Sequence, residues 1–162
     1  MGYMSELLGL PPKPNQPPSL ENANKAIALK NDYAAAYYLR AIVYDRQGKT
    51  NDAIAELERT VAIAPKDIDL IFQVGLIYYQ QGQYLKAQSK FEKVKLLNAD
   101  YSNARYMLGL VYNKEGQDGK AVIEFQKVLE LNPNSDAIKK ILNNLQNGDP
   151  ILSGVQSAPI AQ

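Results

Sequence analysis

Carboxylates are the side chains of this sequence best suited to acid–base chemistry, because the chain contains no histidine and no cysteine. An imidazole base, a thiolate nucleophile and a structural zinc site built on these residues are therefore excluded. The glutamates of interest all lie in predicted helices near Lys or Arg: Glu56, Glu58, Glu92, Glu124 and Glu130. Spacings such as Glu92–Lys95 and Glu124–Lys127 predict ion pairs on helix surfaces. We therefore expect no enzyme activity, no catalytic residue, no metal and no cofactor.

The overall composition is that of a folded domain without a polyanionic partner. The chain has 162 residues, a formal net charge of +1 and 46% hydrophobic residues. Nucleic-acid binders usually carry a basic excess, so we expect no nucleic-acid partner. No apolar run approaches the roughly 20 residues that span a bilayer, and the first residues do not resemble a signal peptide. We therefore expect no direct membrane insertion and a cytoplasmic location, or an extracytoplasmic one if the chain belongs to a larger membrane or secreted protein.

Five columns of similar residues recur with a period of 34 residues, which predicts a repeat architecture. The columns are Ala41/Gly75/Gly109, Tyr44/Tyr78/Tyr112, Gly48/Gly82/Gly116, Ala53/Ala87/Ala121 and Leu57/Phe91/Phe125. Apolar residues within each unit recur at three- and four-residue steps, which indicates helices. We predict a helix A at 34–47, 68–81 and 102–115, and a helix B at 50–63, 84–97 and 118–131. The small residues of the first column let each helix A approach its own helix B.

The unit that begins at Ala104 and runs through Gly109, Tyr112 and Gly116 to Ala121, Phe125 and Pro133 resembles the tetratricopeptide repeat. This resemblance implies an all-α, right-handed α-solenoid of helix–turn–helix repeats. The repeats are 34–67, 68–101 and 102–135, and the whole domain covers 19–147. The chain departs from the pattern at some packing positions, such as Arg40, Ala99 and Arg105.

The segments on either side of the three repeats have their own patterns. Residues 19–33 match a helix B without its helix A, and we read them as a half repeat. Residues 135–147 predict a capping helix with Ser135 as N-cap, an apolar stripe that includes Ile138 and Ile141, and an outward face that includes Asn144. The proline-rich segment 1–18 is expected to be a flexible linker rather than a ligand for a proline-binding domain. We expect 148–162 to be a disordered tail.

The family resemblance also implies that the outward positions of the A helices line a concave, peptide-binding groove. These positions are Tyr38, Ile42, Asp45, Asp69, Phe72, Leu76, Tyr79, Asn103, Tyr106, Leu110 and Asn113. Most of them are apolar, which favours a helical or extended apolar peptide as ligand. The competing interpretation is that these side chains pack on one another or on the ends of the chain. The Lys, Asn and Arg clamp with which some relatives hold acidic chaperone tails is absent, so we expect no binding of such tails.

The function expected from these features is that of a non-catalytic scaffold for protein–protein interaction. The partner would be another protein or peptide, another copy of the chain, or the chain's own tail. Alternatives are a self-assembling scaffold and a segment of a larger bacterial membrane or secretion protein. An RNA-binding helical repeat would need a basic groove, and we regard the Lys86, Lys90 and Lys93 stripe as a solvated surface of helix B.

Overall fold

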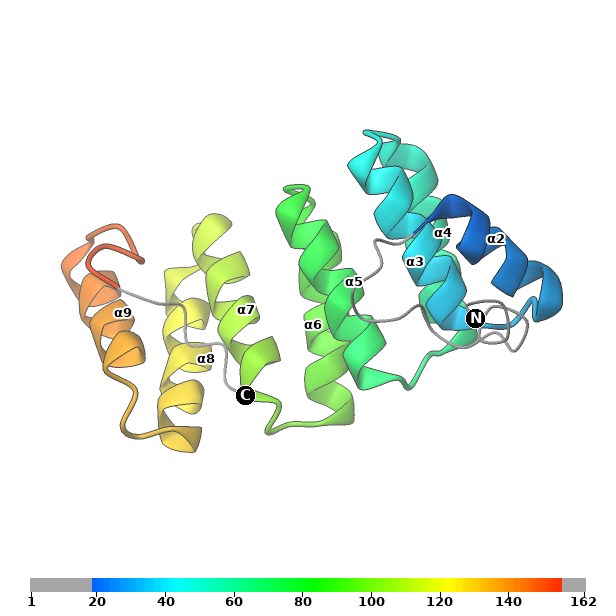
Figure 1. Cartoon of the computed structure of the whole chain (residues 1–162). Coiled ribbons are helices and arrows are strands. Elements are labelled where there is room, and N and C mark those ends of the chain that lie inside the picture. The colour runs from blue at the N-terminus through cyan, green and yellow to red at the C-terminus, as the bar shows by residue number, and fades with distance from the viewer. Residues whose placement is uncertain (1–18, 156–162) are drawn as a thin grey trace, which may run out of the picture. The chain divides into compact units, whose positions relative to one another are not determined.

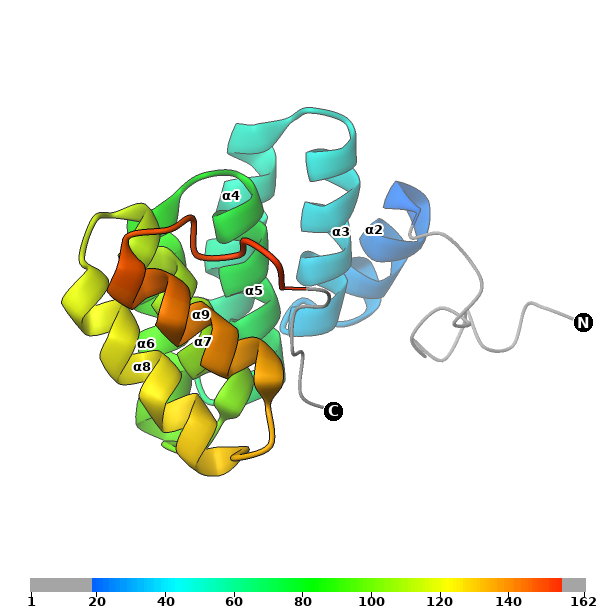
Figure 2. The same cartoon turned by 90° about the vertical axis from the view of Figure 1, so that its left-hand side faces the viewer.

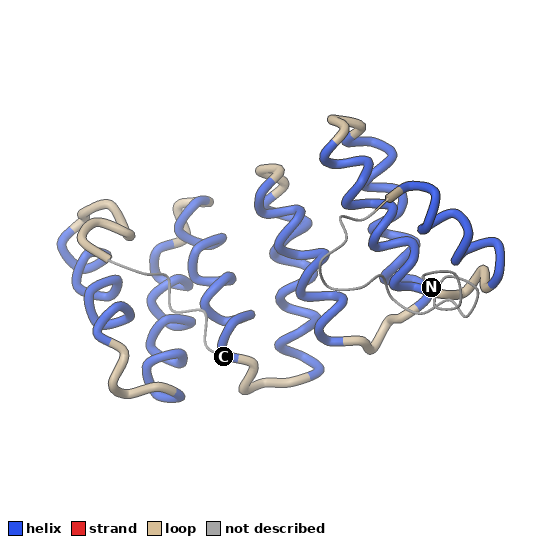
Figure 3. The backbone as a smooth tube through the Cα atoms, viewed as in Figure 1, coloured by secondary structure: helices blue, strands red, loops and turns tan. Residues whose placement is uncertain are grey.

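The computed structural model describes residues 19–155, and these form α-helices and connecting turns without a strand (Figures 1 and 3). The helices are α2 (Leu20–Leu29), α3 (Ala34–Arg46), α4 (Thr50–Ile63), α5 (Ile68–Gln80), α6 (Tyr84–Leu97), α7 (Ser102–Lys114), α8 (Asp118–Leu131) and α9 (Asp136–Asn147). The proline-rich segment 1–18 and the last residues, 156–162, lie outside the described residues. The fold class is the expected all-α helical repeat of the solenoid type.

The predicted helices lie at the predicted positions. The A helices α3, α5 and α7 begin at the expected residues and end one residue earlier, and the B helices α4, α6 and α8 have the expected bounds. Each A helix ends before a glycine with a left-handed backbone, with φ of 72° at Gly48, 72° at Gly82 and 71° at Gly116. Glycine is favoured there because a Cβ would make this conformation strained. The glycine column thus fixes the turn between helix A and helix B.

The chain divides into two compact units, unit 1 up to Leu70 and unit 2 from Ile71 onward. In unit 1, α3 packs against both α2 and α4. In unit 2, α7 packs against α6 and α8, and α8 also packs against α9. Because α3, α7 and α8 each pack against two neighbouring helices, successive helices share a core within each unit.

The contact between helix A and helix B in unit 2 depends on glycine. A Cβ placed on Gly75 would lie 2.6 Å from the Phe91 ring, and one placed on Gly109 would lie 2.6 Å from the Phe125 ring. Both rings are fully buried, so neither can move away without disturbing the core. The predicted close approach at the small-residue column is therefore confirmed at these two positions.

The cap at the end of the array differs in part from its prediction. Ser135 accepts a hydrogen bond from the Ile138 amide, and Ile138 and Ile141 are fully buried, as expected. The expectation that Asn144 faces outward is wrong, because this side chain is only 1% exposed. Its Nδ2 donates to the carbonyl oxygens of Pro150, Ile151 and Ser153, and these bonds hold the chain after α9 in a turn. Residues 148–155, which we expected to begin a disordered tail, therefore form an ordered continuation of the cap.

Candidate functional site

Two of the glutamates considered for acid–base chemistry, Glu56 and Glu124, occupy the same position of their repeats and are buried. Nη2 of Arg40 donates to both carboxylate oxygens of Glu56 on α4, at 2.9 Å from each. Arg40 lies on α3 and also donates to Asn24 of α2 at 2.9 Å. The side chains of Arg40 and Glu56 are only 16% and 12% exposed, so this ion pair ties three helices together inside unit 1.

Glu124 of α8 is held by two cations from two other helices. Nη1 of Arg105 on α7 lies 2.9 Å from one carboxylate oxygen, and Nζ of Lys95 on α6 lies 2.7 Å from the other. Arg105 also donates from Nε to the carbonyl oxygen of Ala99 at 2.6 Å. Both Glu124 oxygens are therefore engaged by cations, which leaves neither free to act on a substrate.

The prediction of surface ion pairs within one helix is wrong for Glu56 and Glu124, and it is confirmed for Glu130. Lys127, the expected partner of Glu124, is paired with Glu130 at 2.8 Å. The actual partners of the buried glutamates lie on other helices, because a buried carboxylate needs a cation at close range to offset the loss of hydration. Among residues 19–155, no group of three or more acidic side chains is arranged to hold a metal ion.

Glu92 of α6 is exposed and takes part in a different contact. Its carboxylate accepts a hydrogen bond of 2.7 Å from the Tyr112 hydroxyl of α7 and one of 2.9 Å from Gln88. The hydrogen bond from Tyr112 and the one from Gln88 lower the pKa of Glu92 below its usual value of 4.5. Burial, followed by the hydrogen bond to Glu92, raises the pKa of Tyr112 well above that of a free phenol. This pair links two neighbouring helices of unit 2 and offers no free base.

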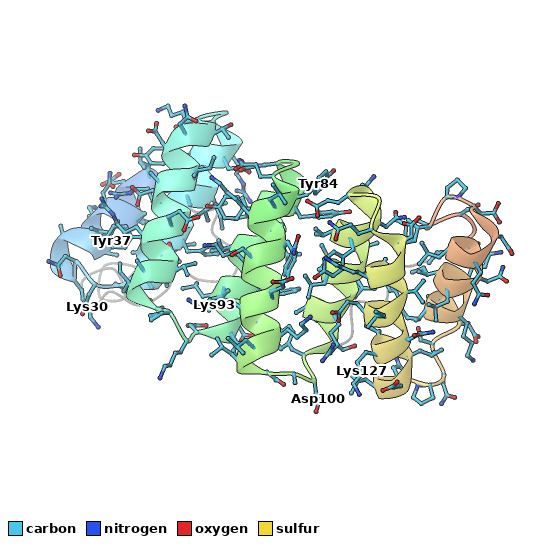
Figure 4. All side chains as sticks on the ribbon, turned by 180° about the vertical axis from the view of Figure 1, so that it is seen from behind. Lys30, Tyr37, Tyr84, Lys93, Asp100 and Lys127 are labelled. Carbon is cyan, nitrogen blue, oxygen red and sulfur yellow. The ribbon has the colours of Figure 1, made fainter. Side chains whose placement is uncertain are left out.

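The predicted groove residues of unit 2 lie on one side of α5 and α7, which we call the A-helix face. In unit 2 these two helices lie toward the viewer in Figure 1, and α6 and α8 lie toward the viewer from behind in Figure 4. The members of the A-helix face are Phe72, Leu76 and Tyr79 on α5 and Asn103, Tyr106, Leu110 and Asn113 on α7. Every side chain of this set is uncharged, whereas the whole predicted groove also includes Asp45 and Asp69.

Burial separates the members of the A-helix face into two groups. Phe72, Tyr106 and Leu110 are 7%, 4% and 8% exposed, so for these three the competing interpretation of packing side chains holds. The Phe72 ring lies 5.5 Å from that of Phe91 and 5.3 Å from that of Tyr101. Phe72, Tyr106 and Leu110 thus form the floor of the A-helix face.

The remaining members are half-buried, namely Leu76, Tyr79, Asn103 and Asn113. Asn113 donates to the Asp118 carboxylate at 2.9 Å, so its amide is already engaged at the start of α8. Leu76 and Tyr79 therefore provide the apolar surface of the A-helix face that a ligand could cover.

The phenol groups on this face sit in an apolar environment. Burial raises the pKa of both Tyr79 and Tyr106, and each case also reflects a neighbouring tyrosine, Tyr84 for Tyr79 and Tyr79 for Tyr106. The Tyr106 hydroxyl is buried and has no hydrogen-bond partner among the residues described. An unpaired buried hydroxyl is costly, and a ligand that supplied a donor or an acceptor would relieve that cost.

In unit 1 the predicted site residues are less apolar as a group. Tyr38, Ile42 and Asp45 on α3 are half-buried, and Asp69 at the start of α5 is exposed. Burial raises the pKa of Tyr38. Two carboxylates among four residues make this set less suited to an apolar ligand than the A-helix face of unit 2.

The opposite side of unit 2, formed by α6 and α8, carries exposed apolar residues that sequence reasoning missed. Leu85 and Leu96 on α6 are 74% and 85% exposed, and Ile123 on α8 is 63% exposed. We call this the B-helix face; Figure 4 shows it from outside, with Tyr84, Lys93 and Lys127 labelled. An open depression of about 920 Å³ runs along α6 and is lined by Leu85, Gln88, Ser89, Glu92, Lys93, Lys95 and Leu96. Charged residues separate the apolar ones, so this face has no continuous apolar stripe.

The lysine stripe on α6 is not evenly solvated. The ammonium groups of Lys86 and Lys90 lie 5.3 Å and 5.9 Å from the centre of the Tyr78 ring. Lys120 lies in the same way 5.3 Å from the Tyr112 ring. These contacts stabilise Tyr78 and Tyr112 by cation–π attraction, and they give the three lysines a structural role on the B helices.

Comparison with known proteins places these units in one family. Two family models, each described as tetratricopeptide repeat, match the chain, one at residues 68–101 and 102–135 and the other at 19–68. Together they cover 19–135. No curated protein matches the chain at a significant level.

Solved structures with a similar fold include proteins of distant sequence. MamA is 20% identical with a TM-score of 0.69, over 82% of this chain and 78% of MamA. The pilF protein of Pseudomonas aeruginosa is 22% identical with a TM-score of 0.67, over 79% of this chain and 59% of pilF. The first repeat domain of Spaghetti (RPAP3), solved with an HSP90 peptide, is 22% identical with a TM-score of 0.61, over 71% of this chain and 91% of that one. Such likeness establishes the fold. Within the described part of the chain, no helix has the length and apolar character needed to cross a membrane.

Proposed function

The chain belongs to the tetratricopeptide repeat family, whose repeats form protein-interaction scaffolds and are typically non-catalytic, and we propose that it binds an apolar peptide segment on the A-helix face of unit 2. The observation that carries this proposal is the uncharged surface of Leu76 and Tyr79 above a floor of Phe72, Tyr106 and Leu110. An incoming aliphatic side chain would remove apolar area from water there at about 25 cal/mol per Å².

The chemistry of the face favours a helical or extended peptide with aliphatic anchors over a charged one. Tyrosine contributes a large, fairly rigid contact area with one polar group, which suits an interaction site. The HSP90 peptide named for the RPAP3 structure, SRMEEVD, is acidic; carboxylates are bound most strongly by cations, and the A-helix face of unit 2 has none. We therefore propose that acidic chaperone tails are not ligands of this face.

The test uses peptides selected from a random 12-residue phage-display library against the whole chain. A selected peptide is then synthesised, and its affinity is measured by isothermal titration calorimetry. Leu76→Glu should weaken binding at least about tenfold, because it puts a charge into the apolar contact (about 1.4 kcal/mol per factor of ten). Leu85→Glu is the matched control, since it makes the same change on the B-helix face at a residue that is 74% exposed.

The outcome is decided by the two leucine variants together. If Leu76→Glu binds as tightly as the unchanged chain while Leu85→Glu does not bind, the ligand site is on the B-helix face and the proposal is wrong. Circular dichroism of both variants shows whether the helices are kept. Phe72 is not used for this test, because its ring is part of the core and its loss would disturb folding.

A further inference from the structure

The turn after α9 is bound to that helix in a specific manner. Nδ2 of Asn144 lies 3.3 Å from the Pro150 carbonyl oxygen, 3.0 Å from that of Ile151 and 2.9 Å from that of Ser153. The Asn144 side chain is 1% exposed, so these bonds are shielded from water. The main chain of 150–153 is therefore fixed on one side of α9.

That side of α9 corresponds to the A-helix face. Asn144 follows Leu110 by one repeat period of 34 residues, and Lys140 follows Tyr106 by the same period. The Lys140 side chain approaches to 3.4 Å from the position of a Cβ on Gly154, so the turn lies over Lys140 as well as Asn144. In Figure 2 the turn can be followed from the end of α9 as it runs back beside this helix. The chain's own main chain thus covers on α9 the positions that form the A-helix face on α7.

The sequence beyond this turn is long enough to continue along the same face. Seven residues, 156–162, follow Val155. Extended, they span at most about 23 Å, at about 3.3 Å per residue. Only α8 separates α9 from α7 along the packing order of unit 2, and packed helices lie about 8–10 Å apart. Tyr106 and Leu110 are therefore within reach.

The chemistry of the two partners agrees. Residues 156–162 read Gln-Ser-Ala-Pro-Ile-Ala-Gln, without a charged side chain. They would meet an uncharged face whose Tyr106 hydroxyl is buried without a hydrogen-bond partner among the described residues. The peptide groups of an extended segment offer both donors and acceptors to such a hydroxyl, and Ile160 offers an aliphatic anchor.

We propose that residues 156–162 occupy the A-helix face of the same molecule over Tyr106 and Leu110, as a built-in competitor of an incoming peptide. This inference rests on the proposed function of that face. A tethered segment has an effective concentration of the order of mM, so a weak contact is enough to fill the face in the absence of a partner. A partner peptide must then displace the segment.

Paramagnetic broadening in nuclear magnetic resonance tests this directly. The chain has no cysteine, so Gln162→Cys gives a single attachment site for a nitroxide label. In a ¹⁵N-labelled sample we expect selective loss of signal for amides of α7 around Tyr106 and Leu110, and not for those around Ile123 on the B-helix face. The matched control adds Ile160→Asp, which should abolish the loss because it removes the anchor.

Two results would overturn the proposal. Equal broadening of both faces, or none, would mean that the segment does not bind the A-helix face. The chain with the nitroxide can also be prepared without ¹⁵N and mixed with ¹⁵N-labelled chain that has no nitroxide. Broadening that occurs only in this mixture would mean that the segment of a second copy is the occupant. The proposed function is judged separately, by the affinity of the selected peptide for Leu76→Glu. A chain that ends at Val155 should bind that peptide more tightly than the full chain.

Discussion

Unit 1 and unit 2 use different residues for the close contact between helix A and helix B and for the pairing of a buried glutamate. Where unit 2 sets Gly109 against Phe125, unit 1 has Ala41 and Leu57, and all of these side chains are buried. A larger residue on helix A thus accompanies a smaller one on helix B. The repeat preserves the combined volume of the pair rather than either residue, as expected for a close-packed interior.

The buried carboxylates differ in a parallel way. Among residues 19–155, Glu56 is paired with one cation, Arg40, whereas Glu124 is paired with two, Arg105 and Lys95. Arg40 and Arg105 occupy different positions of helix A, although Glu56 and Glu124 are exactly two periods apart in the sequence. The first and third repeats thus share the position of the carboxylate, whereas the second repeat has Lys90 there, and the cation comes from different positions of helix A. This contrast gives unit 1 the more vulnerable ion pair.

The largest effect is expected for Arg40→Met. This substitution leaves Glu56 buried without its cation and removes the bond to Asn24 on α2, and should cost about 3 kcal/mol of unfolding free energy. Urea unfolding followed by circular dichroism measures this change. The double variant Arg40→Met with Glu56→Gln should recover part of the loss, because it removes the unpaired charge. A loss below that of Arg105→Met would contradict the contrast between the units.

The next effect tests the volume rule in unit 2. Gly109→Ala places a methyl group 2.6 Å from the Phe125 ring, and we expect a net loss of about 2 kcal/mol, even though alanine favours helices by about 1 kcal/mol over glycine. The pair Gly109→Ala with Phe125→Leu reproduces the residues of unit 1. It should be more stable than the sum of the two single changes predicts, by about 1 kcal/mol. Simple additivity would show that the two positions are not matched in volume.

A smaller loss is expected for Arg105→Met. Lys95 stays 2.7 Å from the Glu124 carboxylate and continues to neutralise it, so the expected cost is about 1 kcal/mol. The same urea titration measures it. Adding Lys95→Met to Arg105→Met should cost more than either change alone predicts, because Glu124 then has neither cation.

The smallest effect concerns Glu92, which is exposed. Its pKa is lowered in the folded chain, chiefly by the hydrogen bond from Tyr112, so the associated stability is present above pH 4.5 and is lost as the pH falls through the lower folded pKa. Tyr112→Phe removes that bond. The midpoint of urea unfolding should therefore fall less on acidification in Tyr112→Phe than in the unchanged chain. An identical pH dependence of the two chains would contradict the assignment.

The sequence predicts the helices well because their signals are local and repeated. The 34-residue period superimposes three copies of each helix boundary, so the B helices occur at the predicted residues. The partners of Glu56 and Glu124 could not be predicted in this way, because the helix-pairing rule considers residues three or four apart. The arginines lie 16 and 19 residues from the carboxylates along the chain.

The sequence predicts on which side of their helices the residues of the candidate site lie, and it does not predict how deeply each is buried. The period assigns Phe72, Tyr106 and Leu110 to the same side as Leu76 and Tyr79, yet it contains no information about which of them the neighbouring helices cover. Their burial depends on tertiary contacts such as the one between Phe72 and Tyr101. The outward position predicted for Asn144 was wrong for the same reason. A polar residue on a capping helix is expected to face solvent unless its hydrogen-bond partners are known.

The most direct test of the account is to map where a selected peptide binds. The unlabelled peptide is titrated into ¹⁵N-labelled chain, and the shifts of the amide signals are followed. If the peptide binds the A-helix face, the largest shifts occur at Leu76, Tyr79 and Tyr106 on α5 and α7. Shifts confined to α6 and α8, around Leu85, Leu96 and Ile123, would contradict the proposal.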